Sequence, residues 1–190
     1  MNSIVRTAGS LLIISAVAAA ALGCVNSATE DKIAQRAVET KNKAMKTVLP
    51  SAASFEEQLG ENDAPIALEQ GGMITSYAKG GDGYAFSVET KGFDKGLNLM
   101  IGIDGEGKIS GFTVVSSNET PGLGAKAKSE GWFDDKFTGK SGDIKVVKTE
   151  TNAPDEVQAI TGATITSKAV TNAVKDVQKF YNEKLKGGKG

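Results

Sequence analysis

An uncharged apolar segment near the N-terminus constrains this chain more than any other feature. No charged residue occurs from Thr7 to Thr29. The apolar part of the segment, residues 8–25, spans about 18 residues, which is near the minimum length for a helix that crosses a bilayer. Arg6 precedes the segment and two acidic residues follow it. Because basic residues tend to remain cytoplasmic, the sequence predicts a single-pass protein of the cell (inner) membrane, with its N-terminus inside and the rest of the chain outside.

Two other fates of the segment stay open. The small residues of "AAAALG", residues 18–23, are compatible with a signal-peptidase site, so the segment can also be a cleaved signal peptide. Cys24 follows Leu22 and Gly23 as in a lipoprotein, although Ala21 stands where such a site prefers a larger aliphatic residue. We expect a retained anchor, and all three alternatives leave the remaining chain outside the cytoplasmic membrane.

The composition excludes several classes of chemistry. The chain of 190 residues has no histidine, so a Ser-His-Asp triad is impossible and the usual catalytic zinc sites lose their commonest ligand. Its single cysteine, Cys24, excludes an internal disulfide, a CxxC pair and a Cys-ligated iron–sulfur cluster. A net charge of -1 gives no sign of a nucleic-acid partner. We therefore predict no catalytic residue and no metal site, and any redox work requires a bound organic cofactor.

The sequence divides into four segments along the chain. The residues after the anchor suit a helix, which Thr29 can cap and which Pro50 ends. We interpret this helix as a stalk between the anchor and the folded domain. The predicted segments are a membrane anchor over 1–28, a stalk helix and linker over 29–70, one folded domain over 71–186 and a tail over 187–190.

Alternating apolar residues and one helical repeat define the domain. The alternation predicts strands over 74–78, 84–90, 97–104, 109–115 and 144–148, most of them in an antiparallel meander. The connection "DGEGK", residues 104–108, indicates a hairpin, and residues 126–137 suit a short helix with Trp132 and Phe133 as its apolar contribution. From Ser167 onward apolar residues recur at helical spacing, at Val170, Ala173, Val174, Val177, Tyr181 and Leu185. The predicted fold class is α+β: a transmembrane and a stalk helix, then one antiparallel-sheet domain with a C-terminal helix.

Four hydroxyl side chains cluster just before this last helix. The stretch "AITGATITSKAVTNAVK", residues 159–175, places Thr161, Thr164, Thr166 and Ser167 where a helix N-terminus favours phosphate. A threonine hydroxyl there can be esterified to a phosphate, and Gly162 leaves room for the backbone to approach it. Spacing alone favours a simpler account, in which Thr166 or Ser167 is the N-cap and Thr164 is an ordinary loop residue.

A second stretch, "NETPGLGAK" at residues 118–126, also indicates a special backbone. Pro121-Gly122 is a turn dipeptide. Gly122 and Gly124 remove side chains, as happens where the backbone contacts a flat ligand. Taken alone, the stretch is more simply a tight surface turn.

Together the two stretches resemble a known family. "DEVQAITGATITSKAVTNAVK" preceded by "ETPGLGAK" resembles the G subunit of the Rnf complex, the ion-translocating ferredoxin:NAD oxidoreductase of bacterial membranes. The resemblance covers most of the chain, and ETPGLG followed by (S/T)GAT is specific. It implies an extracytoplasmic FMN-binding domain in an electron-transfer subunit, which is not a complete enzyme alone, whose partners are the other membrane subunits of a Na+- or H+-pumping complex.

The resemblance also implies the cofactor linkage and the residues of its site. In the family the FMN phosphate is joined by a phosphodiester to the last threonine of (S/T)GAT, here Thr164, by a flavin transferase that uses FAD as donor. The residues expected beside the flavin ring are Glu119, Thr120, Pro121, Gly122, Leu123 and Gly124. Those expected beside the phosphate and ribityl chain are Thr161, Gly162, Ala163, Ile165 and Thr166.

Two alternatives to the Rnf protein are kept. The C subunit of the sodium-pumping NADH:quinone oxidoreductase shares both motifs and the linkage, but it is usually longer, so this compact chain favours the Rnf assignment. The other alternative is a membrane-anchored, non-redox binding module in which a cap and a turn mimic the motifs. Direct binding of NADH is not expected, because no GxGxxG follows a strand and opens a helix.

Overall fold

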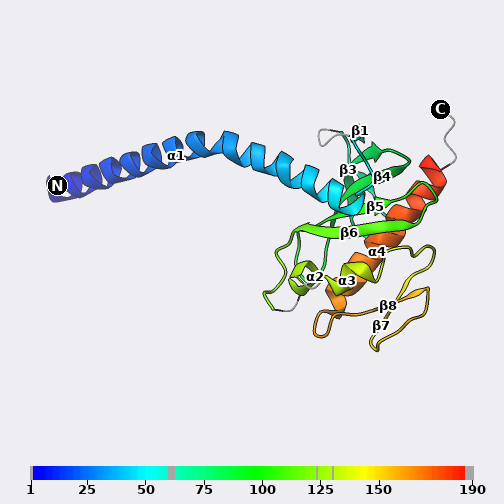
Figure 1. Ribbon diagram of the computed structural model, residues 1–190. Coiled ribbons are helices and arrows are strands. Elements are labelled where there is room, and N and C mark those ends of the chain that lie inside the picture. Colours follow the sequence, from blue (N-terminus) through cyan, green and yellow to red (C-terminus); the bar gives the residue numbers. More distant parts are fainter. Residues whose placement is uncertain (1, 60–62, 123, 130, 187–190) are drawn as a thin grey trace. The chain divides into compact units, whose positions relative to one another are not determined.

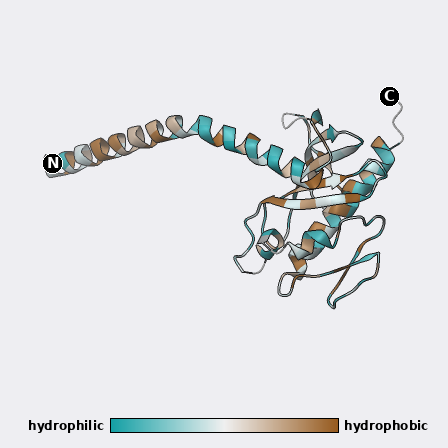
Figure 2. Ribbon diagram, in the orientation of Figure 1, coloured by the Kyte–Doolittle hydropathy of each residue, from teal (hydrophilic) through white to brown (hydrophobic). Residues whose placement is uncertain are grey.

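A long helix and a folded unit make up the protein. The computed structural model describes residues 2–59, 63–122, 124–129 and 131–186, and the chain divides into two compact units, Met1–Lys41 and Asn42–Gly190. Helix α1, Asn2–Val48, runs through the first unit and ends in the second (Figure 1). Within the described part of the chain, α1 is the one helix long and apolar enough to cross a membrane by length and composition. Hydrophobic residues dominate its N-terminal part and hydrophilic residues the part that follows (Figure 2).

The predicted anchor and stalk form one continuous helix rather than two. Thr29, predicted as the N-cap of a separate stalk helix, lies inside α1 and donates its hydroxyl hydrogen bond to the carbonyls of Val25 and Asn26, at 2.9 and 3.1 Å. A threonine whose hydroxyl finds a carbonyl on the preceding turn does not interrupt a helix, so the capping prediction was wrong. The helix ends two residues before Pro50, as predicted.

The folded unit is built on one antiparallel sheet with the strand order β1-β3-β4-β5-β6, in which β2 also pairs with β3. The meander predicted from alternation is β3 to β6, in which consecutive strands pair. Two short strands, β1 and β2, lie in a stretch where no strand was predicted, and β7 pairs in parallel with the unpredicted β8 in a second small sheet. The strands are β1 Glu56–Leu59, β2 Ile66–Ala67, β3 Met73–Gly80, β4 Gly83–Thr90, β5 Leu97–Ile103, β6 Ile109–Ser116, β7 Lys145–Val147 and β8 Glu156–Gln158.

In the described part of the unit, helices α2, α3 and α4 accompany the sheet, and the α+β class is confirmed. Helix α4, Thr164–Phe180, continues into a π-helical turn over Tyr181–Leu185. The single short helix predicted over 126–137 is replaced by two, α2 (Lys126–Ser129) and α3 (Trp132–Asp135). Phe133 is fully buried as expected, whereas Trp132 is 37% exposed and its ring meets that of Phe133 edge-on.

Helix α4 covers one face of the sheet. Its predicted apolar stripe is buried against inward-facing side chains of β3 to β6. Burial of a valine or leucine side chain contributes about 1.5–3 kcal/mol, so this stripe fixes the helix on the sheet. The residues of the contact are Val170, Ala173, Val174 and Val177 of α4 with Ile74, Phe86, Val88, Leu99, Ile101, Phe112 and Val114 of the sheet.

The other face of the sheet receives the last turns of α1, which belong to the same folded unit. Small residues in register form a row across four strands, namely Ala78, Ala85, Gly102 and Gly111. Val48 lies over this row with none of its surface exposed, and the Ser110 hydroxyl donates a 2.5 Å hydrogen bond to its carbonyl. Gly102 leaves the space that Val48 needs, because a Cβ atom at this position would overlap the Val48 carbonyl oxygen. Strand β5, which has a neighbour on each side, is therefore also buried on both faces.

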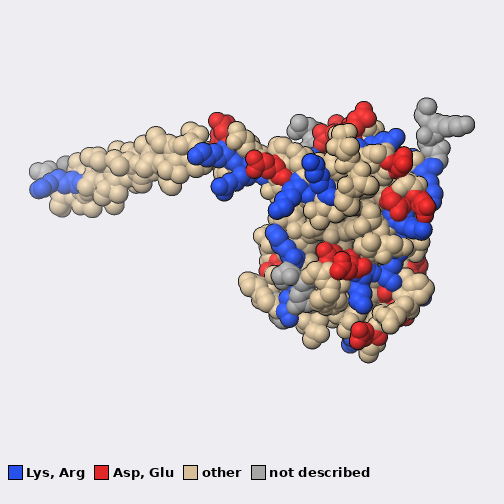
Figure 3. All heavy atoms as spheres, viewed as in Figure 1, with Lys and Arg blue, Asp and Glu red and all other residues tan. Residues whose placement is uncertain are grey.

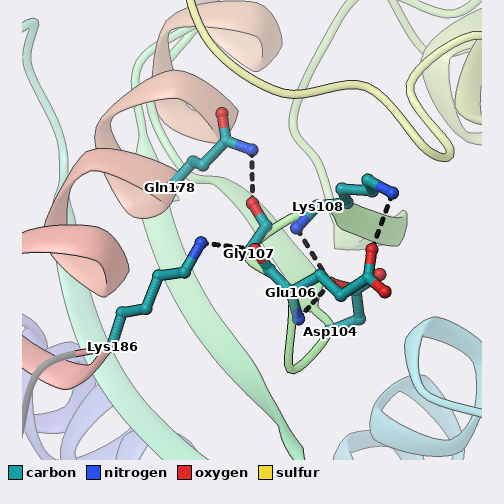
Figure 4. Close-up of polar contacts among 6 residues, drawn as sticks. All are labelled: Asp104, Glu106, Gly107, Lys108, Gln178 and Lys186. Carbon is teal, nitrogen blue, oxygen red and sulfur yellow. Dashed lines mark hydrogen bonds and ion pairs between the residues drawn. The ribbon is translucent and has the colours of Figure 1, made fainter.

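Polar contacts fix the C-terminal end of α4 to the hairpin between β5 and β6 (Figure 4). The buried Gln178 side chain donates to the Gly107 carbonyl at 2.7 Å and accepts from the Gly142 N–H at 2.8 Å. Lys186 donates to the Glu106 carbonyl. Glu106 also pairs with Lys108 at 2.7 Å, and this hydrogen bond lowers the pKa of the Glu106 carboxyl. Since the C-terminal end of α4 is held at this hairpin, its first turn lies at the opposite edge of the sheet, beside the loops that follow β4 and β6.

The row of small residues predicts unequal effects of two neighbouring substitutions. We expect Gly102→Ala to lower the free energy of unfolding by about 1–3 kcal/mol, because the new methyl group overlaps backbone atoms of Val48 that cannot easily move. Gly111→Ala is the matched control, since its methyl group would meet Val48 at an ordinary contact distance of 3.8 Å. Thermal unfolding of the full-length protein in detergent compares them, and equal melting temperatures for the two variants would contradict this packing.

Candidate functional site

A cavity of about 320 Å³ lies at the edge of the sheet where β4 and β6 end. Three segments that are distant in sequence form its wall: the loop after β4, the loop after β6 and the first turn of α4. The lining residues are Phe93, Glu119, Thr120, Gly124, Gly162, Ala163, Thr164, Ile165 and Thr166. The structure therefore brings together the two stretches that the sequence singled out, and it adds a third.

Glu119 connects the three segments. Its side chain is buried, with 5% of the residue exposed. One carboxylate oxygen, Oε2, accepts a 2.6 Å hydrogen bond from the Thr166 hydroxyl on α4, and the other, Oε1, accepts one of 3.0 Å from the Asp94 N–H in the loop after β4. Hydrogen bonds to an ionised carboxylate are about twice as strong as neutral ones.

Two glycines leave the space that this carboxylate occupies. A Cβ atom at Gly92 would overlap Oε1 of Glu119, and one at Gly124 would overlap Oε2. The Cβ at Gly124 would also come within 2.8 Å of the Thr166 hydroxyl. Gly124 was predicted to allow close approach of a ligand, and in the structure the group that approaches it is the protein's own carboxylate.

The first turn of α4, which lines the cavity, begins without a side-chain cap. The N-cap is Ala163, which has no side chain that can accept a hydrogen bond from the first turn. The Ser167 N–H donates to the Ala163 carbonyl at 2.9 Å, so the three N–H groups before it precede the first intrahelical bond. Gly162, with φ of +80°, turns the chain into the helix in a conformation that favours glycine. A helix start of this kind has a partial positive charge and suits an anion.

The structure distinguishes the four hydroxyls of the cluster. Thr166 is buried and donates to Glu119, and Ser167 is buried, accepts from the Ile160 N–H at 3.0 Å and donates to the Ala163 carbonyl at 2.9 Å. Thr161 is exposed and does not line the cavity. Thr164, the first residue of α4, is half-buried and lines it.

The predicted cap of α4 was wrong. Neither Thr166 nor Ser167 caps the helix, because both lie inside its first turn and their hydroxyls are used by other partners. The helix therefore begins at Thr164, within the motif rather than after it.

The outer part of the cavity is apolar. The side chains of Phe93 and Ile165 are 66% and 56% exposed, although both line the cavity. Phe93 was missed in the sequence analysis. The signal for it is a lone aromatic residue between glycines in "KGFDKG", residues 91–96, in the loop between two predicted strands.

Pro121 and Gly122 do not line the cavity. Pro121 and Gly122 form the predicted turn on the surface, and Gly122 has a φ of +77°. Leu123 lies outside the described residues. Within the described ranges, no group of three His, Cys, Asp or Glu side chains is arranged to hold a metal ion.

Comparison with known proteins identifies relatives of the chain. Residues 92–179 match the family described as the FMN-binding domain. The G subunit of the Na(+)-translocating ferredoxin:NAD(+) oxidoreductase complex from Acetobacterium woodii is 41% identical over 186 residues, which covers 90% of this chain and 89% of the relative. The G subunit of the proton-translocating ferredoxin:NAD(+) oxidoreductase complex from Clostridium ljungdahlii is 34% identical, and the match covers 92% of this chain and 90% of the relative.

A solved structure also aligns with part of the chain. It is the crystal structure of the C subunit of the Na(+)-translocating NADH-quinone reductase from Parabacteroides distasonis. It aligns with a TM-score of 0.48 and 26% sequence identity over 63% of this chain and 64% of that chain.

Proposed function

The chain belongs to the family of G subunits of ion-translocating oxidoreductase complexes, and on this premise we propose that it carries FMN and transfers electrons between membrane partners of such a complex. Relatives that match about nine tenths of both chains are G subunits, which favours this assignment over the C subunit of a sodium-pumping NADH:quinone oxidoreductase. The FMN-binding domain match over 92–179 includes residues of all three segments of the cavity and favours a flavoprotein over a non-redox binding module.

The cavity has the chemistry that FMN requires. Its volume of about 320 Å³ falls in the range of small-molecule sites. The uncapped start of α4 would hold the phosphate through backbone N–H groups. The exposed apolar side chains of Phe93 and Ile165 would lie against the flavin ring, and the backbone at Thr120 and Gly124 would complete the wall. When bound, FMN supplies a group that accepts and donates one or two electrons.

We propose that the flavin is attached covalently to Thr164. Thr166 and Ser167 are buried and engaged, and Thr161 lies outside the cavity, so Thr164 has the hydroxyl best placed for reaction. A flavin transferase would catalyse attack of the Thr164 hydroxyl oxygen on the FMN-side phosphorus of FAD. The new O–P bond replaces the pyrophosphate bond, AMP leaves, and the hydroxyl proton is released. The resulting phosphodiester keeps one negative charge, which the helix start stabilises.

The observation that carries this proposal is the position of Thr164 at the start of α4, and removal of its hydroxyl tests it. We expect Thr164→Val, coexpressed with a flavin transferase, to lose covalent flavin completely, because the variant has no nucleophile at the attachment position. The measurement is in-gel flavin fluorescence after denaturation, together with intact mass. Thr164→Ser should retain the attachment, and Thr161→Val should be modified like wild type. Persistent fluorescence in Thr164→Val would reject the site, and a colourless wild type of unmodified mass would favour the non-redox alternative.

Phe93 provides a test of where the flavin ring lies. We expect Phe93→Ala to increase quenching of the attached flavin's fluorescence by iodide, because the side chain would no longer shield the ring from solvent. Trp132→Ala is the control, since Trp132 is also an exposed aromatic side chain but does not line the cavity. An unchanged quenching constant in Phe93→Ala would place the ring away from this loop.

We propose that residues 1–28 anchor the protein with its N-terminus in the cytoplasm and the flavin domain outside. A covalent tether suits that location, where a lost cofactor is not readily replaced. In a Cys24→Ser background, Ser51→Cys should react with a membrane-impermeant maleimide added to intact spheroplasts, because residue 51 follows α1 and is exposed. Ser3→Cys should react only after permeabilisation. The opposite labelling pattern would reverse the assigned topology.

A further inference from the structure

We propose that Glu119 and Thr166 form a latch that assembles the flavin cavity before the cofactor arrives, so that Glu119 is a positioning residue rather than a ligand. This inference rests on the proposed function for the identity of the ligand. Its physical basis is the pair of hydrogen bonds that Glu119 accepts from two different segments of the chain. These two hydrogen bonds give each oxygen of the buried Glu119 carboxylate a donor from the protein, without a contribution from a ligand in the cavity.

The Glu119 carboxylate is already engaged by the protein. Each of its oxygens has a donor, the Thr166 hydroxyl at 2.6 Å and the Asp94 N–H at 3.0 Å. The Glu119 N–H is also engaged, since it donates to the Ser117 hydroxyl at 3.0 Å. A buried carboxylate is costly unless it is hydrogen-bonded, so both donors must stay in place while Glu119 is buried.

Each of the two donors belongs to a segment that forms the cavity wall. Asp94 directly follows Phe93, so its N–H fixes the loop that places an apolar side chain at the cavity. Thr166 is two residues after Thr164, in the same helical turn as the proposed attachment point. One carboxylate therefore sets the spacing between the proposed ring contact and the proposed phosphate site.

The space around the carboxylate matches its size. Gly92 and Gly124 approach it from two loops, and a methyl group at either position would overlap one of its oxygens. Both loops therefore have a glycine where the Glu119 carboxylate needs space. An incidental hydrogen bond between two side chains would not need glycines at these two positions.

The test compares two buried threonines of the same helix. Thr166→Val removes the donor to Glu119, whereas Thr171→Val removes a buried hydroxyl that donates only within the helix, to the Ser167 carbonyl at 2.8 Å. Both variants are made as full-length protein without a flavin transferase, so that the measurement does not depend on the cofactor. Hydrogen exchange with mass spectrometry then reports the protection of the segment 91–96, and β5 serves as the internal reference for global stability.

We expect Thr166→Val to accelerate exchange in 91–96 about tenfold relative to β5, because loss of one donor leaves a buried carboxylate unsatisfied and releases the Asp94 N–H. Thr166→Ser, which keeps the hydroxyl, should restore protection, and Thr171→Val should not change it. Wild-type exchange in Thr166→Val, or equal acceleration of 91–96 and β5, would overturn the proposal. If Thr166→Val does not fold, Gly92→Ala provides the same comparison by displacing the carboxylate from the other side.

A second readout follows the cofactor. With a flavin transferase present, Thr166→Val should attach flavin more slowly, and its visible circular dichroism should change, while Thr166→Ser matches wild type. A flavin spectrum identical to wild type in Thr166→Val would contradict a positioning role. The two proposals fail separately: absence of flavin in every variant would reject the proposed function, whereas the exchange experiment would still decide whether the latch exists.

Discussion

The burial of α4 against the sheet is the constraint on which the rest of the structure depends. Its valines occupy one face of the meander, and Gln178 holds its C-terminal end to the hairpin between β5 and β6. With one end fixed in this way, the first turn must lie where β4 and β6 end, beside the loops that carry Phe93 and Glu119. Two parts of the helix therefore have different surroundings: an apolar stripe is buried against the sheet, and the first turn lines the cavity. The last turns of α1 cover the other face of the sheet, so both faces of the meander are packed and the cavity lies beyond the ends of β4 and β6.

The surface charges of the described residues do not form one large patch of a single sign on the face shown in Figure 3, so an anion in the cavity would be affected mainly by groups close to it. Basic and acidic side chains are interspersed on the visible face of the protein (Figure 3), in keeping with a net charge of -1. Such a surface does not concentrate a field of one sign at the cavity. An anion bound there is therefore stabilised mainly by the nearby start of α4, an effect of about 0.3–1 kcal/mol at exposed sites and up to ~2 kcal/mol when partly buried.

The sequence allowed prediction of the elements whose signals are local. Alternation identified β3 to β6, and helical spacing identified the buried face of α4. Interactions between distant residues account for what was missed. The hydroxyl of Thr166 suggested an N-cap, but its partner, Glu119, lies 47 residues away, and a local pattern contains no sign of that bond. The short strands β1, β2 and β8 have too few residues to show a period and exist because longer or equally short neighbours pair with them. Phe93 gave no periodic signal because it belongs to a loop.

A covalent link changes what the remaining contacts must do. If Thr164 holds the cofactor by a bond, the non-covalent contacts need not supply affinity, and their free energy is available to fix orientation instead. Such a division of roles fits one feature of the cavity wall, a buried carboxylate whose two oxygens each accept a hydrogen bond from a protein donor. Such a group contributes little to net stability, since the cost of its burial offsets most of the gain from its hydrogen bonds. On the proposal made above, it favours one arrangement of three segments, because another arrangement would leave a buried carboxyl group without its hydrogen-bond donors. If Thr164 is the attachment point, a cavity held in this way has its shape before the flavin enters it, and the tether then keeps the flavin there.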